Sequence, residues 1–325
     1  MAQATLYGNI DQAYVKSTTT VAGVQTANTT GVASYQMGGS QIGVKGEEDL
    51  GGGLKASFLH EMGVTSDVDS TPTTRQAYVG LSGGFGALRV GKQYSNAFGN
   101  LISSDPFGAT GGTGALYVGQ ILLGNQGTSG DNPLRQDKAI QYDLPSFVPG
   151  LRVGLTKVAS GTDTTDGSDP KTGDSTGYGI AYASGPFNVG FTSDSITAQD
   201  IAATSVTVTD SSKTKLTTLA LGYDLGVAKV TFSDSKIMNT GQGVEVTMFA
   251  IAVPMGAATL MASQSNGKVV LTAGNTTLKG VQYGANYALS KRTTAYFHAN
   301  NSTSTTTANS VTKVKGYGIG LMHNF

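Results

Sequence analysis

The sequence contains no cysteine and no tryptophan, and it has only three histidines among 325 residues. Without cysteine there is no disulfide framework, no thiolate metal site and no cysteine nucleophile. His60, His298 and His323 provide few ligands for a zinc centre and few bases for a Ser-His-Asp triad. Asp residues gather between 162 and 174, but they lack the spacing of a defined calcium loop. We therefore expect no metal site and no cofactor.

Charge is also scarce. Charged residues make up 13% of the chain, about half of the roughly 25% that is usual for soluble globular domains. The 21 basic and 21 acidic residues cancel, and the pI is near 6.8. Because a nucleic-acid binder needs a basic face to meet phosphate, we expect no nucleic-acid partner. Zero net charge also excludes a typical disordered chain, in which low hydrophobicity accompanies high net charge.

No apolar run is long enough for a membrane-spanning helix, which needs about 18 or more consecutive residues. The most apolar stretch, 249–262, is interrupted by Pro254, Gly256 and Thr259. The chain opens with MAQA and enters a strand pattern at once. We expect a mature sequence from which a signal peptide has been removed and to which a start methionine has been added.

What the chain does have is apolar residues with a period of two. In the last segment, Tyr317, Ile319 and Leu321 alternate with glycine and Met322. Similar alternation occurs at 151–156, 187–192, 219–223 and 281–289. A strand with this pattern has one face in an apolar medium and the other against a polar one.

The connections between these segments alternate between short turns and long loops rich in Ser, Thr, Gly, Asn and Asp. Seven short turns and eight long loops join sixteen segments of roughly 9–15 residues, which begin with 3–16 and 32–46 and end with 292–300 and 311–325. An even number of strands arranged in this way predicts an up-and-down barrel. Eight strands can fill their interior with side chains, but sixteen enclose a wider lumen. The sequence therefore predicts an all-β, 16-stranded antiparallel transmembrane barrel over 1–325, a single domain with a polar lumen and a lipid-facing outer wall.

A secreted β-solenoid or an adhesin passenger domain can have a similar composition. A solenoid should show a short regular repeat. The sequence shows none, and its loops vary from three to about forty residues. The pattern favours the barrel.

Six motifs, in this order along the whole chain, resemble the general porins of Gram-negative β-proteobacteria. They are TLYGNID at 5–11, GVKGEEDLGGGLKA at 43–56, RQAYVGLSGGFG at 75–86, LRVGKQ at 88–93, YDLPSF at 142–147 and GLMHNF at 320–325. The resemblance implies a homotrimer in the bacterial outer membrane, surrounded by lipid and lipopolysaccharide. Ions and small hydrophilic solutes would pass through its pore by passive diffusion. It also implies that Phe325 is part of the signal read by the barrel-assembly machinery.

The resemblance further implies that the third extracellular loop, here 95–134, folds into the lumen and narrows it. In such porins, basic residues from one wall face acids from this loop. The matching positions are Arg75 and Arg135, with Gln41 where the family usually has a third basic residue. This departure weakens the expected positive field.

Lys45 shares the face of Gln41 and is expected to point inward with the basic wall. The candidates for the acidic side of the constriction are Glu61, Asp105 and Asp131. Because the charges nearly balance, we expect a weakly selective pore with a slight preference for anions.

Two alternatives remain open. A substrate-specific porin would need a saturable site lined by aromatic residues, for which Tyr94 and Tyr117 are the candidates near the loop. A structural or sheath barrel would not conduct ions by itself. An outer-membrane enzyme would need a nucleophile and base in reach of each other, and the three histidines lie in strands with no such context, so we expect no catalysis.

Overall fold

The structure is a computed structural model that describes residues 3–34, 36–65, 69, 71–108, 135–159, 174–197, 213–239, 242–271 and 274–325. Within these residues there are seventeen strands and one α-helix, and no helix is long and apolar enough to cross a bilayer. The helix is α1 (Asn96–Ser104). The strands are β1 (Gln3–Val21), β2 (Val24–Ser34), β3 (Gln41–Gly51), β4 (Leu54–Gly63), β5 (Thr73–Gly83), β6 (Gly86–Tyr94), β7 (Arg135–Asp143), β8 (Leu151–Val158), β9 (Ser175–Ser184), β10 (Phe187–Thr197), β11 (Lys213–Asp224), β12 (Lys229–Asn239), β13 (Gln242–Met255), β14 (Ala258–Val270), β15 (Thr276–Ala288), β16 (Thr293–Thr306) and β17 (Val311–Asn324).

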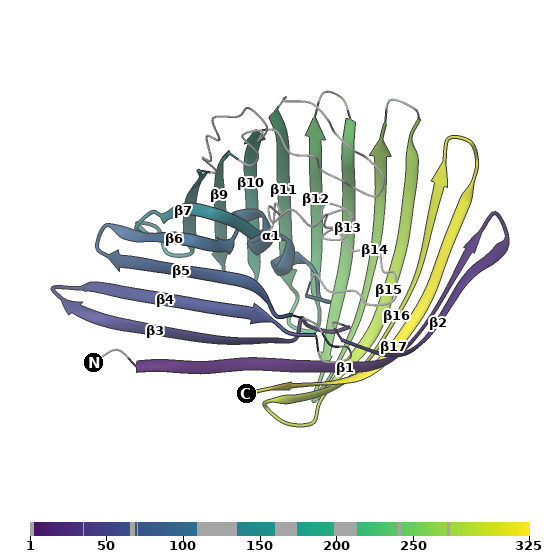
Figure 1. Cartoon of the computed structure of the whole chain (residues 1–325), viewed down its shortest axis with the longest axis horizontal. Coiled ribbons are helices and arrows are strands. Elements are labelled where there is room, and N and C mark those ends of the chain that lie inside the picture. The colour runs from purple at the N-terminus through teal and green to yellow at the C-terminus, as the bar shows by residue number, and fades with distance from the viewer. Residues whose placement is uncertain are drawn as a thin grey trace.

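The strands form one closed antiparallel barrel (Figure 1). Each strand from β3 to β17 pairs with its neighbour in the chain, and β17 pairs with β1 to close the ring. β2 and β3 lie end to end beside β1, β2 along its second half and β3 along its first. The ring is therefore sixteen strands wide, which confirms the predicted barrel, with one strand position divided in two.

The expected loop at 17–31 is wrong. β1 continues to Val21, and β2 begins at Val24 after a tight turn at Ala22 and Gly23, both of which have positive φ. Nearly all of β2 is exposed. Because this hairpin is exposed, its sequence needs no apolar alternation, and its Thr-rich strands look like a loop.

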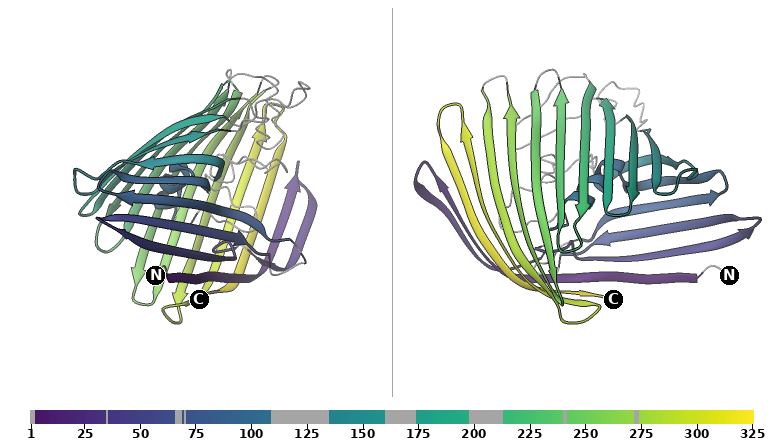
Figure 2. Two further views of the ribbon diagram at one scale, coloured as in Figure 1. Left: turned by 60° about the vertical axis from the view of Figure 1, so that its left-hand side comes forward. Right: turned by 180° about the vertical axis from the view of Figure 1, so that it is seen from behind.

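Both termini lie at the end of the barrel that carries the short turns (Figure 2). In outer-membrane barrels this end is periplasmic and the end with the longer loops is extracellular. Large apolar side chains cover the outer wall between the two ends, among them Val79, Phe249, Tyr283 and Ile319. Their exposure in the isolated chain is the property expected of a wall that faces lipid.

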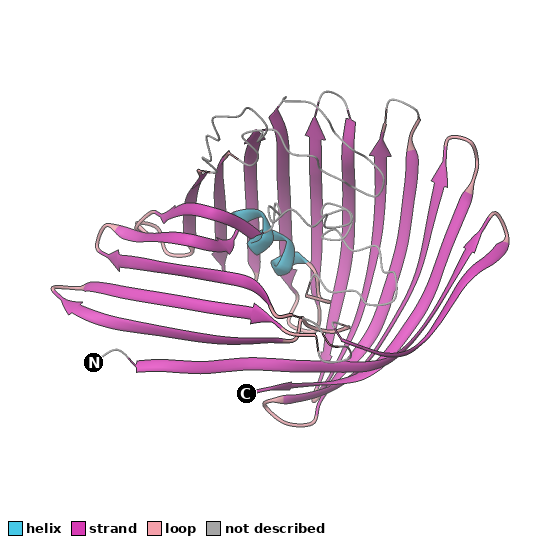
Figure 3. Cartoon of the chain, viewed as in Figure 1, coloured by secondary structure: helices cyan, strands magenta, loops and turns pink. Residues whose placement is uncertain are grey.

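The inner wall is not uniformly polar. Helix α1 lies inside the ring (Figure 3) and packs on β9, β10, β11 and β12. Its Ala97 and Leu101 belong to a buried apolar cluster with inward side chains of the facing wall. These are Leu216, Ile237, Val244, Val246, Met248, Val269 and Leu278. The expectation of a polar lumen face therefore fails on this side, where inward apolar side chains pack into one buried cluster with residues of α1.

Candidate functional site

The part of the wall formed by β1 and β3–β7 carries a row of charged and aromatic side chains. We call Tyr7, Lys45, Glu61, Arg75, Tyr94 and Arg135 the charged wall. They come from six strands that adjoin in the ring. Register places Tyr7 beside Gly43 on β3 and Gly43 beside Glu61 on β4, so these positions share the inward face.

Glu61 is at the centre of the charged wall and is 4% exposed. One carboxylate oxygen accepts a hydrogen bond from the Tyr7 hydroxyl at 2.7 Å, and the other accepts one from Arg75 Nε at 3.0 Å. Glu61 points inward, as expected from the alternation of side chains along its strand. It lies next to Arg75, however, and not across the lumen from it, because β4 and β5 are neighbouring strands.

Tyr94 connects the two arginines of the wall. Its hydroxyl accepts a hydrogen bond from Arg75 Nη2 at 2.7 Å. The guanidinium carbon of Arg135 lies 5.3 Å from the centre of its ring. The ring also stacks on Phe98 of α1, with centroids 4.2 Å apart. Sequence reasoning noted Tyr94 only as an aromatic residue beside the loop, and the structure makes it the contact between wall and helix.

Lys45 and Gln41 extend the charged wall on β3. Lys45 Nζ lies 5.0 Å from the centre of the Tyr7 ring, and the lysine is exposed. Gln41 pairs with Asn9 and Gly63, two inward positions from Lys45 on the other side of Gly43. Glu61 neutralises Arg75, so the wall keeps the positive charges of Lys45 and Arg135.

The first part of the predicted constriction loop is also held against β8–β12, on the side of the ring away from β1 and β3. Ser95 caps α1 by accepting a hydrogen bond from the Phe98 amide at 3.2 Å. Asn96 donates to Thr156 Oγ1 at 3.3 Å, and Asn100 donates to Thr218 Oγ1 at 3.2 Å. The described part of the loop, 95–108, therefore lies inside the ring.

Of the two acids predicted in the constriction loop, the structure describes Asp105 but not Asp131. Asp105 ends α1, is 7% exposed, and accepts a hydrogen bond from the Phe107 amide at 2.9 Å. Its carboxylate is thus engaged in a turn. Asp131 lies outside the described residues, as do the remainder of the loop at 109–134, with Tyr117, and the Asp-rich stretch at 162–173. The role of either acid in ion selection stays a prediction.

A second polar cluster, which sequence reasoning missed, lies where β1, β16 and 36–40 meet. The Tyr296 hydroxyl donates to one carboxylate oxygen of fully buried Asp11 at 2.5 Å, and the amides of Met37 and Gly38 donate to the other at 2.7 and 2.9 Å. His298 follows on β16. The sequence could have predicted this cluster, because Asp11 is spaced by two and by four residues from Asn9 and Tyr7. On a strand this spacing places Asp11 on the same inward face.

This cluster also holds the end of the described loop. The Phe107 ring meets the His298 ring edge-on, with centroids 5.2 Å apart. His298 Nε2 lies 2.9 Å from Asn286 Oδ1. The loop therefore contacts β16 through Phe107, in addition to the contacts that Asn96 and α1 make with the wall.

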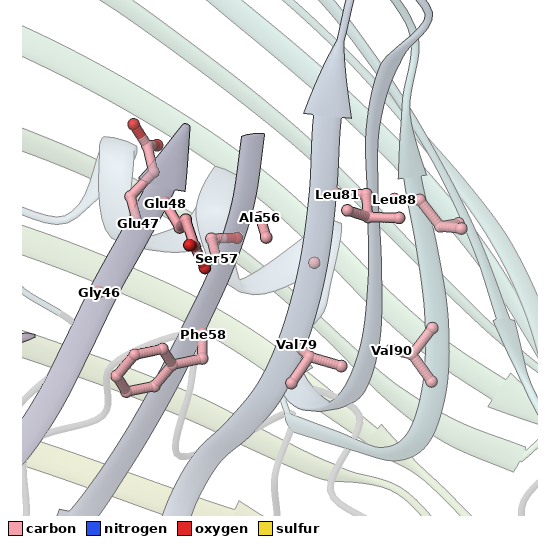
Figure 4. Close-up of a pocket in the computed structure, with 11 residues that line it drawn as sticks. Gly46, Glu47, Glu48, Ala56, Ser57, Phe58, Val79, Leu81, Leu88 and Val90 are labelled. Carbon is pink, nitrogen blue, oxygen red and sulfur yellow. The ribbon is translucent and has the colours of Figure 1, made fainter. Parts of the chain in front are cut away.

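An apolar groove of about 440 Å³ lies on the outer surface over β3–β6 (Figure 4). Phe58, Val79, Leu81, Leu88 and Val90 line it, with Glu48 at one end. Since these side chains point away from the lumen, the groove is separate from the charged wall.

Comparison with known proteins agrees with this architecture. A family model described as Gram-negative porin matches residues 1–324. The chain is 32% identical to outer membrane porin protein 32 of Delftia acidovorans over 71% of its length, which spans 63% of that relative. It is 29% identical to the major outer membrane protein P.IB of Neisseria meningitidis serogroup A, covering 100% of this chain and 95% of the relative.

Solved structures show the same fold. The anion-selective porin from Comamonas acidovorans superposes with a TM-score of 0.81 at 24% identity and full coverage of both chains. An OmpF structure from Salmonella typhi superposes with a TM-score of 0.72 at 15% identity, over 99% of this chain and 97% of that one. The closed barrel, its charged wall and the family match along almost the entire sequence together show that this chain belongs to the Gram-negative porin family.

Proposed function

We propose that the protein is a general diffusion porin of the bacterial outer membrane. The observation that carries this proposal is a closed barrel with an apolar outer wall and a row of charged side chains along one side of its lumen. A sixteen-stranded barrel is wide enough for an aqueous channel. Ions and small hydrophilic solutes would cross it by diffusion, and we infer that it works as a channel and not as an enzyme.

We further propose a slight preference for anions. Selectivity in a wide channel is set by charged side chains at its narrowest point. Lys45 and Arg135 keep their charges on the described wall, whereas Glu61 offsets Arg75 and the carboxylate of Asp105 is engaged in a turn. The anion selectivity named for the Comamonas acidovorans porin supports the same sign.

We propose a homotrimer in contact with lipid and lipopolysaccharide, and assembly through recognition of Phe325 by the barrel-assembly machinery. A trimer form is named for OmpT, an outer membrane protein of Vibrio cholerae, which has the same fold with a TM-score of 0.64. The Phe325 side chain lies on the outer surface and is 42% exposed, which makes it accessible to a partner. Chemical cross-linking in mild detergent tests the trimer. A ladder ending at three copies supports it, and the presence of single copies alone contradicts it.

A substrate-specific porin with a saturable site is the second candidate function. Tyr94 favours it, because this ring lies in the lumen between Arg135 and Phe98. Saturation of solute flux at millimolar concentrations would support this candidate, and linear flux would support general diffusion.

The deciding experiment is planar-bilayer recording under a KCl gradient. The general porin predicts ohmic single-channel steps in groups of three and a small reversal potential on the anion side. A cation preference would keep the channel but overturn the assigned charge balance. Well-folded, heat-modifiable barrels without any conductance would exclude diffusion and favour the sheath alternative.

A further inference from the structure

One buried carboxylate on the inner wall has no part in the charged wall. Asp194 lies on β10, close to the extracellular end of the strand at Thr197, and is 1% exposed. Strand alternation places it on the inward face with Thr192 and Ile196, which are 1% and 6% exposed. Both of its carboxylate oxygens are buried and have no hydrogen-bond partner in the protein. Because a buried, unpaired carboxylate opposes folding, this negative charge needs a partner.

No cationic side chain in the described part of the chain is that partner. None of the five ion pairs found there includes Asp194. Lys215 on the neighbouring strand β11 is exposed, and it stands between two buried inward residues, so it points outward. The guanidinium of Arg135 lies over the Tyr94 ring.

Two further buried oxygens without a hydrogen-bond partner belong to residues beside this carboxylate. They are Oγ of Ser175 on β9, which is 4% exposed, and Oε1 of Gln136 on β7, which is 6% exposed. Register pairs Asp194 with Gly177, and Ser175 occupies the next inward position along β9. The Gln136 amide approaches the Asp194 carboxylate, outside the geometry of a regular hydrogen bond.

Gly177 allows the carboxylate to lie over β9. A Cβ on Gly177 would collide with Oδ1 of Asp194. The Asp194 side chain therefore leans toward β9, the side on which β8 and β7 follow in the ring, and away from β11. The unpaired hydroxyl of Thr214 is on β11, so we do not count it with the others. The missing side chain of Gly177 leaves room for oxygen-bearing side chains of β7, β9 and β10 to converge.

The converging atoms suit a hard cation. They are the two oxygens of a carboxylate, one hydroxyl oxygen and one amide oxygen. Ca²⁺ takes about six to eight such oxygens in a flexible geometry and accepts carboxylates in bidentate mode, whereas Mg²⁺ demands a near-ideal octahedron and keeps several waters. A proton would neutralise Asp194 but would supply a single hydrogen-bond donor, which leaves the other oxygens unpaired.

We propose that Asp194, Ser175 and Gln136 bind one Ca²⁺ in the extracellular half of the lumen, with water completing its coordination. No acid cluster marks the site in the sequence, and no three His, Cys, Asp or Glu side chains that could hold a metal come together among the described residues. With a single carboxylate the site is weak, with a dissociation constant on the order of 10⁻⁴–10⁻³ M, as in extracellular calcium modules. Because Gln136 follows Arg135 at the start of β7, the ion would tie the point where the chain rejoins the wall to β9 and β10.

The test measures how Ca²⁺ changes the unfolding temperature of refolded, heat-modifiable protein in detergent. Metal is first removed with a chelator, and about 0.1 M NaCl is present throughout. D194N keeps the shape of the side chain and removes its charge. D234N is the matched control, because Asp234 stands between Ser233 and Ser235, inward residues that are 0% exposed, and so lies on the outer face.

Ca²⁺ up to about 10 mM should raise the unfolding temperature of the unmodified protein and of D234N in a saturable way, and should leave D194N unchanged. Equilibrium dialysis with ⁴⁵Ca²⁺ should count one ion fewer per barrel in D194N than in D234N. S175A keeps the carboxylate and should raise the Ca²⁺ concentration at half-saturation at least about threefold.

An equal response of D194N and D234N to Ca²⁺ would place the ion elsewhere and overturn the proposal. An unmodified barrel that ignores Ca²⁺, while D194N is more stable at every Ca²⁺ concentration, would mean that Asp194 is neutralised by a proton alone. If D194N does not refold, S175A decides, and an unchanged half-saturation in S175A would contradict the site. Neither measurement depends on conductance, so the outcome is independent of the proposed channel function.

Discussion

At the scale of single residues, the buried contact between Glu61 and Arg75 decides which charges the lumen presents. Their side chains are 5% and 14% exposed, and Tyr7 and Tyr94 complete their hydrogen bonds. Such a pair is close to neutral when seen from the pore. The positive field on the described wall then comes from Lys45 and Arg135. The carboxylate of Glu61, which we expected on the acidic side of the constriction, instead neutralises an arginine of the basic wall.

This arrangement predicts opposite effects of two neutralising substitutions on ion selectivity. E61Q should raise the preference for chloride, because it releases the charge of Arg75. R135Q should lower it. A unit charge about 7 Å from the ion path changes its energy by ~0.6 kcal/mol in water, or about threefold in relative permeability. Reversal potentials under a KCl gradient measure the selectivity of E61Q and of R135Q. Shifts of the same sign in the two variants would contradict the roles assigned to Glu61 and Arg135.

R75Q should reduce stability as well as selectivity, because it leaves the buried Glu61 carboxylate without its cation. Breaking a buried pair from one side costs about 3–5 kcal/mol. The double variant R75Q/E61Q should recover much of this loss and return the reversal potential close to that of the unmodified protein. Urea unfolding in detergent reports the stability. If the double variant is as unstable as R75Q, the pair is not coupled as described.

Sequence alternation predicted the inward faces of Glu61 and Lys45 correctly, because the period of a strand is two wherever one face is apolar. It could not predict the close approach of Arg75 to Glu61. The register shifts between Glu61 and Met62, and this irregularity turns Arg75 inward beside Glu61. A local bulge of this kind leaves no mark in the hydrophobic pattern.

At the scale of elements, the sequence predicted strands best where they cross lipid. Outside the bilayer the β1–β2 hairpin looked like a loop, since both of its faces meet water. The inward apolar residues of β11 and β13, Leu216, Val244 and Val246, also contradicted a polar lumen. They belong to one buried cluster with Ala97 and Leu101 of α1, and such tertiary burial cannot be read from the pattern of a single strand.

Helix α1 depends on inward glycines of the wall beneath it. A Cβ at Gly190 would collide with the Asn100 side chain, which is tied to Thr218. G190A should therefore push α1 away from the wall into the lumen, lower the single-channel conductance and cost about 1–3 kcal/mol of stability. G99A is the matched control on the helix itself, since no atom lies within 4 Å of its new Cβ. Identical conductance of both variants would show that Asn100 does not position the helix.

At the scale of the whole molecule, the barrel depends on closure between the two ends of the chain. Gly8 and Phe325 exchange two backbone hydrogen bonds, of 3.1 and 3.0 Å, beyond the last pair of the β1–β17 ladder. Lipid offers no partners for an open strand edge. The final residue thus has a structural role in closure that is separate from its proposed role as an assembly signal.

Gly8 allows this closure because the Phe325 ring occupies the space above it. A Cβ at Gly8 would stand 2.6 Å from the ring's Cζ and would also clash with the Gln41 carbonyl. G8A should therefore destabilise the folded barrel by roughly 1–3 kcal/mol and lower its unfolding temperature in heat-modifiability gels. G31A, on a strand position with no atom within 4 Å of the added Cβ, should leave that temperature unchanged. Because G8A keeps Phe325 itself, a loss of stability in purified, refolded protein reports closure alone; unchanged melting of G8A would mean that the ring moves aside freely and that the last residue does not lock the barrel.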